Sequence, residues 1–312
     1  MLIRNAEVWE HGLADVRVAG GSIAELGRLS PGDGEVVMEA AGNALLPGLH
    51  DHHIHLAALA ARQASIACGP PEVTDAASLA QALARPGRGW LRGTGYHESV
   101  MGLPTARELD ALLQDRPLRI QHRSGRMWLL NSLALAALLE RAEPPPGLER
   151  DAQGYTGRLF DEDDWLRTAL GAAPPSLRDV SRELARCGVT GVTDMSPRND
   201  HAMAAHFAAE MGRGSLVQRV TLAGSAALGE AAPGPWVLGP AKLHLHEAAL
   251  PDFAAATQFI AEAHRQGRAV AVHCVSEVEL VFTLALFETA GSEHGDRIEH
   301  ASVASGELVA RI

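Results

Sequence analysis

Short runs of alternating apolar and polar residues fill the first 46 positions of the chain. The runs "MLIRNAEVW", "ADVRVAGGSIAELG" and "EVVMEAAGNALL" are separated by Gly, Asp and Asn residues. Such alternation is typical of β-strands with one buried face, and "AGGS" is typical of a tight hairpin turn. The pattern therefore predicts a small β-domain over residues 1–46.

The pattern changes after Pro47, where helix-like segments alternate with short apolar strands that end in polar residues. The predicted strands are "GWLRGTGY", "LRIQHRS", "GVTGVTDM", "LVQRVTLAG", "AKLHLHE", "AVAVHCV" and "DRIEHAS". Several helix-like segments between them end at a glycine, as helices often do. This alternation predicts an α/β fold over residues 47–312, with parallel strands forming a barrel under covering helices. Prolines flank residues 141–175, which we expect to form an excursion over the barrel mouth, in the manner of a lid.

Histidines gather at the predicted strand ends. The stretch "LLPGLHDHHIHLAAL" holds His53 and His55, and later strands end with His273 and His300. Residues two apart on a strand point to one side, and the carboxyl ends of parallel barrel strands meet at one face. Neutral imidazoles are good zinc ligands, so these four side chains are candidate metal ligands.

The other histidines are weaker candidates for a functional role. His11, His201, His206, His264 and His294 are best interpreted as surface or structural residues. For His50, His52 and His97, the structural and the functional interpretations both stay open.

Net charge, cysteine pattern and the length of the apolar runs limit the partners and the compartment that we expect. The net charge is -11, from 38 acidic and 27 basic residues, which argues against nucleic acid as a partner. The three cysteines form no CxxC pair and indicate a reducing compartment. No apolar run is long enough for a membrane span, and no secretory signal opens the chain. We therefore expect a cytoplasmic protein that acts on a small-molecule substrate, without nucleic-acid or membrane partners; a homo-oligomer stays open.

The sequence resembles the amidohydrolase superfamily. "LLPGLHDHHIHL" is similar to its first-strand motif, Pro-Gly-x-x-Asp-x-His-x-His, and "RIEHA" is similar to its sixth strand. The branch it most resembles is the amidohydrolase-3 group, which contains N-substituted formamide deformylase-like enzymes. "GWLRGTGY", "RDAQGYTGRL", "GVTGVTDM" and "VAVHCVSE" match that branch in order and spacing.

This resemblance implies a (β/α)8-type, TIM-like barrel that holds one or two divalent metal ions, with zinc expected. It implies that the metal ligands are His53, His55, Lys242, His273 and His300. Lys242 matches a lysine that many members carry as a carbamate formed with CO2. The implied reaction is hydrolysis of an amide, formamide or cyclic amide C–N bond by metal-activated water.

The chain departs from the family pattern in several places. The strand-eight aspartate that shuttles the proton has no match after His300, and the barrel therefore reads as incomplete after strand six. Asp194 is a weak substitute candidate for that proton shuttle. "SGR" replaces a usual Asp-Gly-His, so Arg126 is a candidate contact for an anionic substrate. His97 and His246 are further candidate substrate-binding residues.

Two alternatives to an active hydrolase follow from these departures. One is a metal-binding but inactive truncated paralogue or fragment, and the other is a partial barrel that another chain completes. Dinucleotide-binding and serine-hydrolase functions are disfavoured, because the chain has neither a G-x-G-x-x-G motif after a strand nor a G-x-S-x-G elbow.

Overall fold

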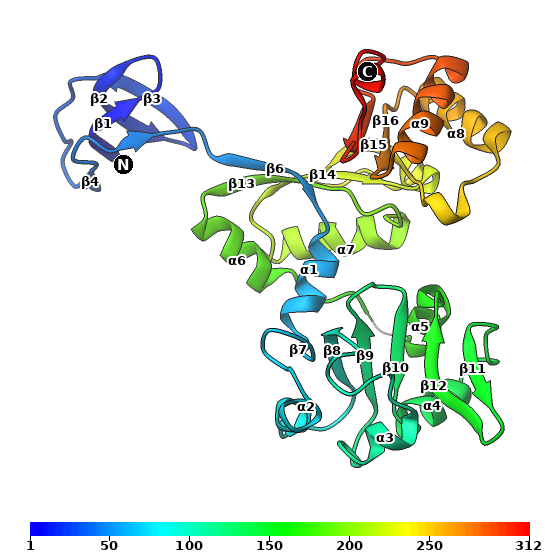
Figure 1. The fold of residues 1–312 in the computed structure, drawn as a ribbon. Coiled ribbons are helices and arrows are strands. Elements are labelled where there is room, and N and C mark those ends of the chain that lie inside the picture. The colour runs from blue at the N-terminus through cyan, green and yellow to red at the C-terminus, as the bar shows by residue number, and fades with distance from the viewer. Residues whose placement is uncertain (172) are drawn as a thin grey trace.

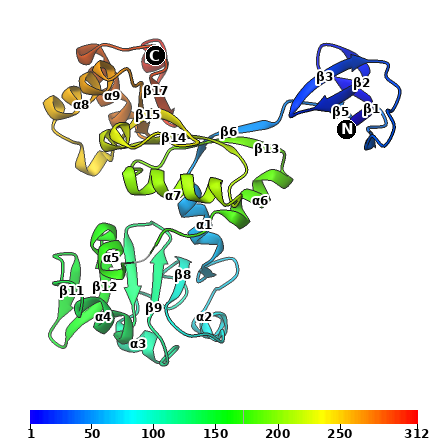
Figure 2. The same cartoon turned by 180° about the vertical axis from the view of Figure 1, so that it is seen from behind.

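The computed structural model describes residues 1–171 and 173–312, which form three β-sheets with their helices (Figure 1). The first sheet contains β1 (Leu2–Val8), β2 (Gly12–Ala19), β3 (Ser22–Gly27), β4 (Val37–Glu39) and β5 (Ala44–Leu45). It stands apart from the other two sheets in both views and is joined to them through one strand, β6 (Figures 1 and 2). The β-strands predicted in the first 46 residues are therefore present.

The predicted hairpin is also confirmed. Ala19 pairs with Ser22 across the turn between β2 and β3, and Gly20 and Gly21 both have positive φ, 57° and 78°. Glycine adopts this left-handed backbone without a steric penalty, which explains why the turn has this sequence.

The second sheet is curled and contains six parallel strands. Its order is β17-β16-β15-β14-β13-β6. The strands are β6 (Leu49–Ile54), β13 (Val189–Asp194), β14 (Arg219–Gly224), β15 (Val237–His244), β16 (Val270–Cys274) and β17 (Arg297–His300). The associated helices are α1 (Leu56–Gln63), α6 (Arg178–Arg186), α7 (His201–Gly212), α8 (Phe253–Arg265), α9 (Glu277–Ala290) and α10 (Gly306–Val309), with 3-10 turns η1 (Ala226–Glu230) and η2 (Glu247–Ala249). We call this sheet with its helices the half-barrel.

Alternation along the half-barrel strands separates an apolar face from a polar one. Ala241 on β15 and Val270 and Val272 on β16 pack against Ile260 of α8. The residues between them point to the opposite face, where Lys242 and the strand-end histidines lie. The burial of one face under helices thus orients the polar residues of the other.

The third sheet is built from residues between α1 and α6, and we call it with its helices the inserted lobe. Its order is β11-β12-β10-β9-β8-β7. The strands are β7 (Ile66–Ala67), β8 (Leu91–Tyr96), β9 (Leu118–His122), β10 (Met127–Leu130), β11 (Leu148–Asp151) and β12 (Gly154–Phe160), and the helices are α2 (Ala76–Leu83), α3 (Ala106–Asp110), α4 (Ser132–Leu139) and α5 (Asp163–Leu170). Strands β7, β8 and β9 are parallel, and the remaining pairs are antiparallel.

The inserted lobe differs from the arrangement that the sequence predicts. "GWLRGTGY" and "LRIQHRS" form strands, but these strands, β8 and β9, belong to this separate sheet and not to the barrel. Most of the expected excursion at residues 141–175 is likewise part of it, because β11 and β12 extend the sheet next to β10; Ala172 of that range lies outside the described residues. Alternation shows that a segment is a strand, but it does not show which sheet the strand joins.

None of the helices in the described part of the chain combines the length and the apolar character needed to cross a membrane.

The three cysteines lie in different environments, which predicts different thiol reactivity. Burial raises the pKa of Cys68 to about 12 and that of Cys274 to about 11, whereas Cys187 is exposed. Because the thiolate is the reactive form, we expect only Cys187 to react rapidly with Ellman's reagent near pH 8. All three should react after denaturation. Fast reaction of the native Cys187→Ser variant would contradict this packing.

Candidate metal centre

Five imidazoles form a continuous group at the carboxyl ends of β6, β15, β16 and β17. The ring centroid of His53 lies 5.4 Å from that of His55 and 4.8 Å from that of His300. The His273 ring lies 4.7 Å from His300 and stacks on His244 at 4.2 Å. Strand register explains the second part of this group, because His244 pairs with His273 and Cys274 pairs with His300 in neighbouring parallel strands.

Lys242 lies on the same face of β15, two residues before His244. It is 5% exposed, and its Nζ has no hydrogen-bond partner among the described residues. Burial lowers the pKa of this ammonium group to about 8, although the charge of Glu299 opposes the shift. An unpartnered buried amine is costly, and it indicates a group that takes part in chemistry or ligand binding.

Glu299 contacts His53 and lies near enough to Lys242 for its charge to act on it. Its Oε2 lies 2.6 Å from Nδ1 of His53, and the side chain is buried. Burial raises the pKa of this carboxyl, but the hydrogen bond from His53 and the charges of Arg297 and Lys242 outweigh that effect and lower it. A carboxylate at Nδ1 fixes the ring and leaves Nε2 free, as is usual for histidines that bind metals.

The surroundings keep most of these imidazoles neutral. Burial lowers the pKa of His55, His244 and His300, and nearby positive groups add to the effect at each. For His273, burial together with His244 and His300 lowers the pKa to about 4. Only the neutral imidazole offers a lone pair to a metal ion, so the lowered pKa values of these four side chains favour the form that can bind a metal.

Asp194 lies at the end of β13, close enough to His55 for its charge to oppose the lowering of that residue's pKa. It is fully buried, and its two carboxylate oxygens accept three hydrogen bonds, from Leu56 N (2.7 Å), Ser196 N (3.0 Å) and Asn199 Nδ2 (2.9 Å). These bonds tie β13 to the start of α1, directly after His55. Asp194 therefore positions the start of α1 and, with it, His55.

The loops after β15 and β16 are held by a third buried carboxylate, which the sequence did not single out. Glu279 in the first turn of α9 accepts from Glu247 N (2.8 Å) and from Val275 N (2.6 Å). One side chain thus joins the loop beyond His244 to the loop beyond His273. Its capping box with Ser276 is visible in the sequence, but its contact with Glu247 depends on tertiary structure.

The predicted substrate-binding residues lie outside the imidazole group. Arg126, at the edge of the inserted lobe, is exposed and makes two 2.7 Å bonds to Asp161. The charge of His246 contributes to the lowered pKa of Asp161, which places this ion pair near the half-barrel. A second link, between Arg198 after β13 and Asp164 of α5, measures 3.2 Å.

His97 lies at the same edge of the lobe, after β8, where its Nε2 is 3.4 Å from Glu98. The structure thus places Arg126 and His97 in the inserted lobe and His246 in the half-barrel, all outside the imidazole group.

The side chains gathered here are of chemical types that can bind a metal ion. They comprise neutral imidazoles, a free Nε2 on the carboxylate-bound His53, and the unpartnered Nζ of Lys242. As the side chains lie, however, no three or more His, Cys, Asp or Glu residues converge on one ion position within residues 1–171 and 173–312. The rings are gathered, but their nitrogens are not aimed at a single point.

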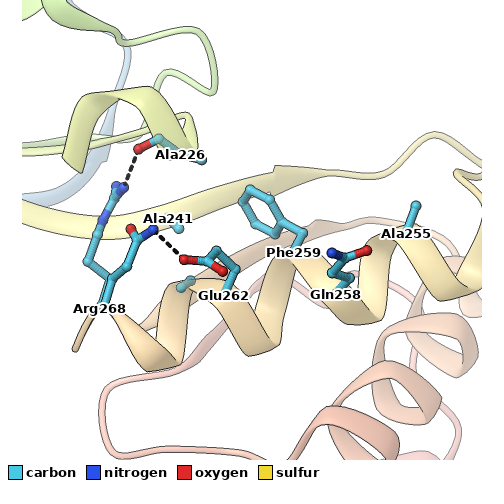
Figure 3. Close-up of a pocket in the computed structure, with 9 residues that line it drawn as sticks. Ala226, Ala241, Ala255, Gln258, Phe259, Glu262 and Arg268 are labelled. Carbon is cyan, nitrogen blue, oxygen red and sulfur yellow. Dashed lines mark hydrogen bonds between the residues drawn. The ribbon is translucent and has the colours of Figure 1, made fainter. Parts of the chain in front are cut away.

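A hollow elsewhere in the half-barrel is not part of this group. It has a volume of about 250 Å³ and lies between α8 and η1, on the helix side of β15 (Figure 3). Phe259 and several alanines line it, and Arg268 closes one end by donating to the Ala226 carbonyl. Ala241 also faces this hollow, so the hollow lies on the opposite side of the sheet from Lys242.

Comparison with known proteins gives a consistent family and fold. Residues 36–312 match the family model described as "Amidohydrolase family". The chain is 28% identical over 208 residues to N-substituted formamide deformylase of Arthrobacter pascens, in an alignment that covers 57% of this chain. That alignment covers 38% of the relative, so the chain spans about two-fifths of its length.

Two solved structures share the fold. An uncharacterized metal-dependent hydrolase from Pyrococcus horikoshii OT3 superposes with a TM-score of 0.78 and 18% identity, covering 99% of this chain and 72% of that one. An uncharacterized metal-dependent hydrolase from Pyrococcus furiosus gives a TM-score of 0.74 and 18% identity, covering 100% and 74%.

Removing the Asp194 carboxylate should destabilise the half-barrel. Asp194→Ala leaves three donors without their acceptor, and we expect a loss of about 2–4 kcal/mol in the free energy of unfolding. Urea titration followed by circular dichroism measures it. The control, Asp33→Ala, removes an exposed aspartate and should change stability by less than about 0.5 kcal/mol. Equal stability of the two variants would contradict the positioning role of Asp194.

Proposed function

Because the chain belongs to the amidohydrolase family, we propose that its half-barrel is the active site of a metal-dependent hydrolase that cleaves a C–N bond. The substrate class is a small amide, formamide or cyclic amide. One observation carries the proposal: four strand-end imidazoles gather beside a buried lysine whose Nζ has no hydrogen-bond partner among the described residues. The similarity to a formamide deformylase supports the substrate class.

The proposed metal ligands are His53, His55, His273 and His300, with Lys242 as the fifth, either as the amine or as a carbamate formed with CO2. One or two divalent ions, zinc in the first place, suit neutral imidazole donors. Such an ion supplies a Lewis acid for the substrate carbonyl and lowers the pKa of water near it.

The surrounding side chains have roles that their contacts define. Glu299 holds His53 through Nδ1, so that Nε2 is the ring nitrogen left for a metal ion. Asp194 is the proposed group that passes a proton to the leaving nitrogen. Its two oxygens accept three hydrogen bonds, and a carboxylate has about four acceptor sites, so one stays open for that proton. Arg126, His97 and His246 are proposed to contact the substrate from the lobe and from η2.

A second candidate function is metal binding without turnover, or a half-barrel that another chain completes. The observation that favours it is the pair of sheet edges: within the described residues, β6 and β17 each pair with a neighbour on one side only. Unpaired edges of this kind readily take up a further strand.

Metal content tests the proposed centre. We expect the purified protein to hold one or two equivalents of zinc or a similar ion, and the His53→Ala/His55→Ala variant to lose it. His11→Ala, which removes an exposed histidine of the first sheet, is the matched control and should retain the metal. Elemental analysis after gel filtration gives both values. A metal-free wild type after zinc addition, or equal metal in the double variant, would refute the centre.

Turnover separates the two candidate functions. Zinc-loaded protein would be incubated with a panel of N-substituted formamides and simple amides, and the released amine would be quantified. Release by the wild type and by His11→Ala, but not by the double variant, supports the hydrolase. Metal retention without release from any substrate supports the second candidate.

Glu299→Gln should weaken metal binding while the fold is preserved. The amide is close in size to the carboxylate but cannot hold the His53 ring with the same charge, and loss of such a partner typically costs 10–100-fold in metal affinity. Competition with a coloured chelator measures the affinity. The control is Glu277→Gln, an exposed glutamate in the first turn of α9. Unchanged affinity in Glu299→Gln would show that His53 does not depend on this carboxylate.

A further inference from the structure

A second hollow lies in the inserted lobe, at the carboxyl ends of its three parallel strands. Its volume is about 460 Å³, and its lining comes from α1, the loop after β7, and the ends of β8 and β9. The main polar lining residues are Arg62, Ser65, Thr94, Gln121, His122 and Arg123. In open parallel sheets this edge is where ligands commonly bind, and the volume suits a small molecule.

Glycines keep the floor of this hollow open. A Cβ on Gly69 would lie 1.9 Å from the carbonyl oxygen of Gly95, so the two backbone segments pass in direct contact. Gly95 itself has a φ of +77°, which side-chain-bearing residues rarely adopt. The loop after β7 therefore packs directly on the backbone at the end of β8.

The hollow is cationic in a chain whose net charge is -11. Arg62 and Arg123 are exposed at its rim, and neither forms an ion pair within the described part of the chain. Glu72 is the one acidic side chain in the lining. His122 faces Glu98, with Nε2 and Oε2 3.3 Å apart, so the two arginines supply the positive charge.

Two more arginines lie behind the lining. Arg92 donates to Ser65 Oγ (2.5 Å) and to Gln121 Oε1 (3.2 Å), both of which face the hollow. Arg119, its register partner on β9, lies over the Trp128 ring at 5.6 Å. Neither guanidinium has a carboxylate within 4 Å among the residues that the structure describes.

Burial lowers the pKa of both guanidinium groups, that of Arg119 to about 10 with a contribution from Arg92. The charge of Asp163 opposes the lowering at Arg92, so two desolvated guanidinium groups lie behind the lining, with the Asp163 carboxylate near one of them.

A structural role accounts for part of this arrangement. Arg92 also donates to the Ala61 carbonyl in the last turn of α1, where a cation is favourable, and so it fastens α1 to the lobe. That contact does not account for Arg62 and Arg123, whose guanidinium groups are free at the rim. Guanidinium groups pair best with carboxylate and phosphate oxygens, often through two parallel hydrogen bonds.

We propose that this hollow binds a small molecule through an oxyanion group, a carboxylate or a phosphate, held by Arg62 and Arg123. Arg92 and Arg119 contribute positive potential from behind Ser65 and Gln121. The site shares no residue with the imidazole group of the half-barrel, so the proposal stands whether or not that group binds metal.

Anion titration of the purified protein tests the proposal. Inorganic phosphate and malonate would be titrated separately by isothermal calorimetry at low ionic strength. We expect saturable binding of at least one of them, and the tighter ligand identifies phosphate or carboxylate as the preferred group. Arg62→Ala/Arg123→Ala should weaken that binding on the order of tenfold or more. Added salt should also weaken it, because the contacts are partly exposed charges.

The control removes two exposed arginines of α6, Arg182→Ala/Arg186→Ala, and so changes the net charge by the same amount. It should bind the anion as the wild type does. Absence of saturable binding of either anion would overturn the proposal. So would equal loss of affinity in both double variants, which would trace the binding to overall charge. Circular dichroism and thermal unfolding show that each variant is folded.

Discussion

Parallel pairing of the half-barrel strands is the constraint on which the candidate metal centre depends. It brings the carboxyl ends of β6, β15, β16 and β17 to one edge, and its register sets His244 beside His273 and His273 beside Glu299. A shift of one residue in any strand would turn its side chains to the helix-covered face. The apolar contacts of Val270, Val272 and Ala241 with α8 therefore determine where the imidazoles point.

Burial of this face also determines the charge states of the groups on it. The face that carries Lys242 and Glu299 excludes water from both groups, and burial there lowers the pKa of His273 and so favours its neutral form. Buried carboxylates fix the frame around this face: Glu299 holds the His53 ring, Asp194 ties β13 to α1, and Glu279 joins the loops after β15 and β16. Each makes its contacts between segments far apart in the chain, so the centre is a property of the folded half-barrel.

Much of the gathering of the histidines can be predicted from the sequence, because His53, His55, His273 and His300 each lie at the end of a predicted strand. The inserted lobe cannot, since the alternation in β8 and β9 is the same whether they pair with the barrel or with a separate sheet. Glu299 was missed although it precedes His300, because its contact with His53 spans 246 positions. The cationic hollow was missed because Arg62 and Arg123 come together only through the pairing of β7, β8 and β9.

Binding of a divalent metal by the strand-end imidazoles of the half-barrel is tested most directly by crystallography of the zinc-loaded protein, with anomalous data collected on both sides of the zinc absorption edge. We expect one or two anomalous peaks within coordination distance, about 2.0–2.1 Å, of nitrogens of His53, His55, His273 and His300. Zinc bound only at other residues, or no peak in a folded half-barrel, would contradict this expectation.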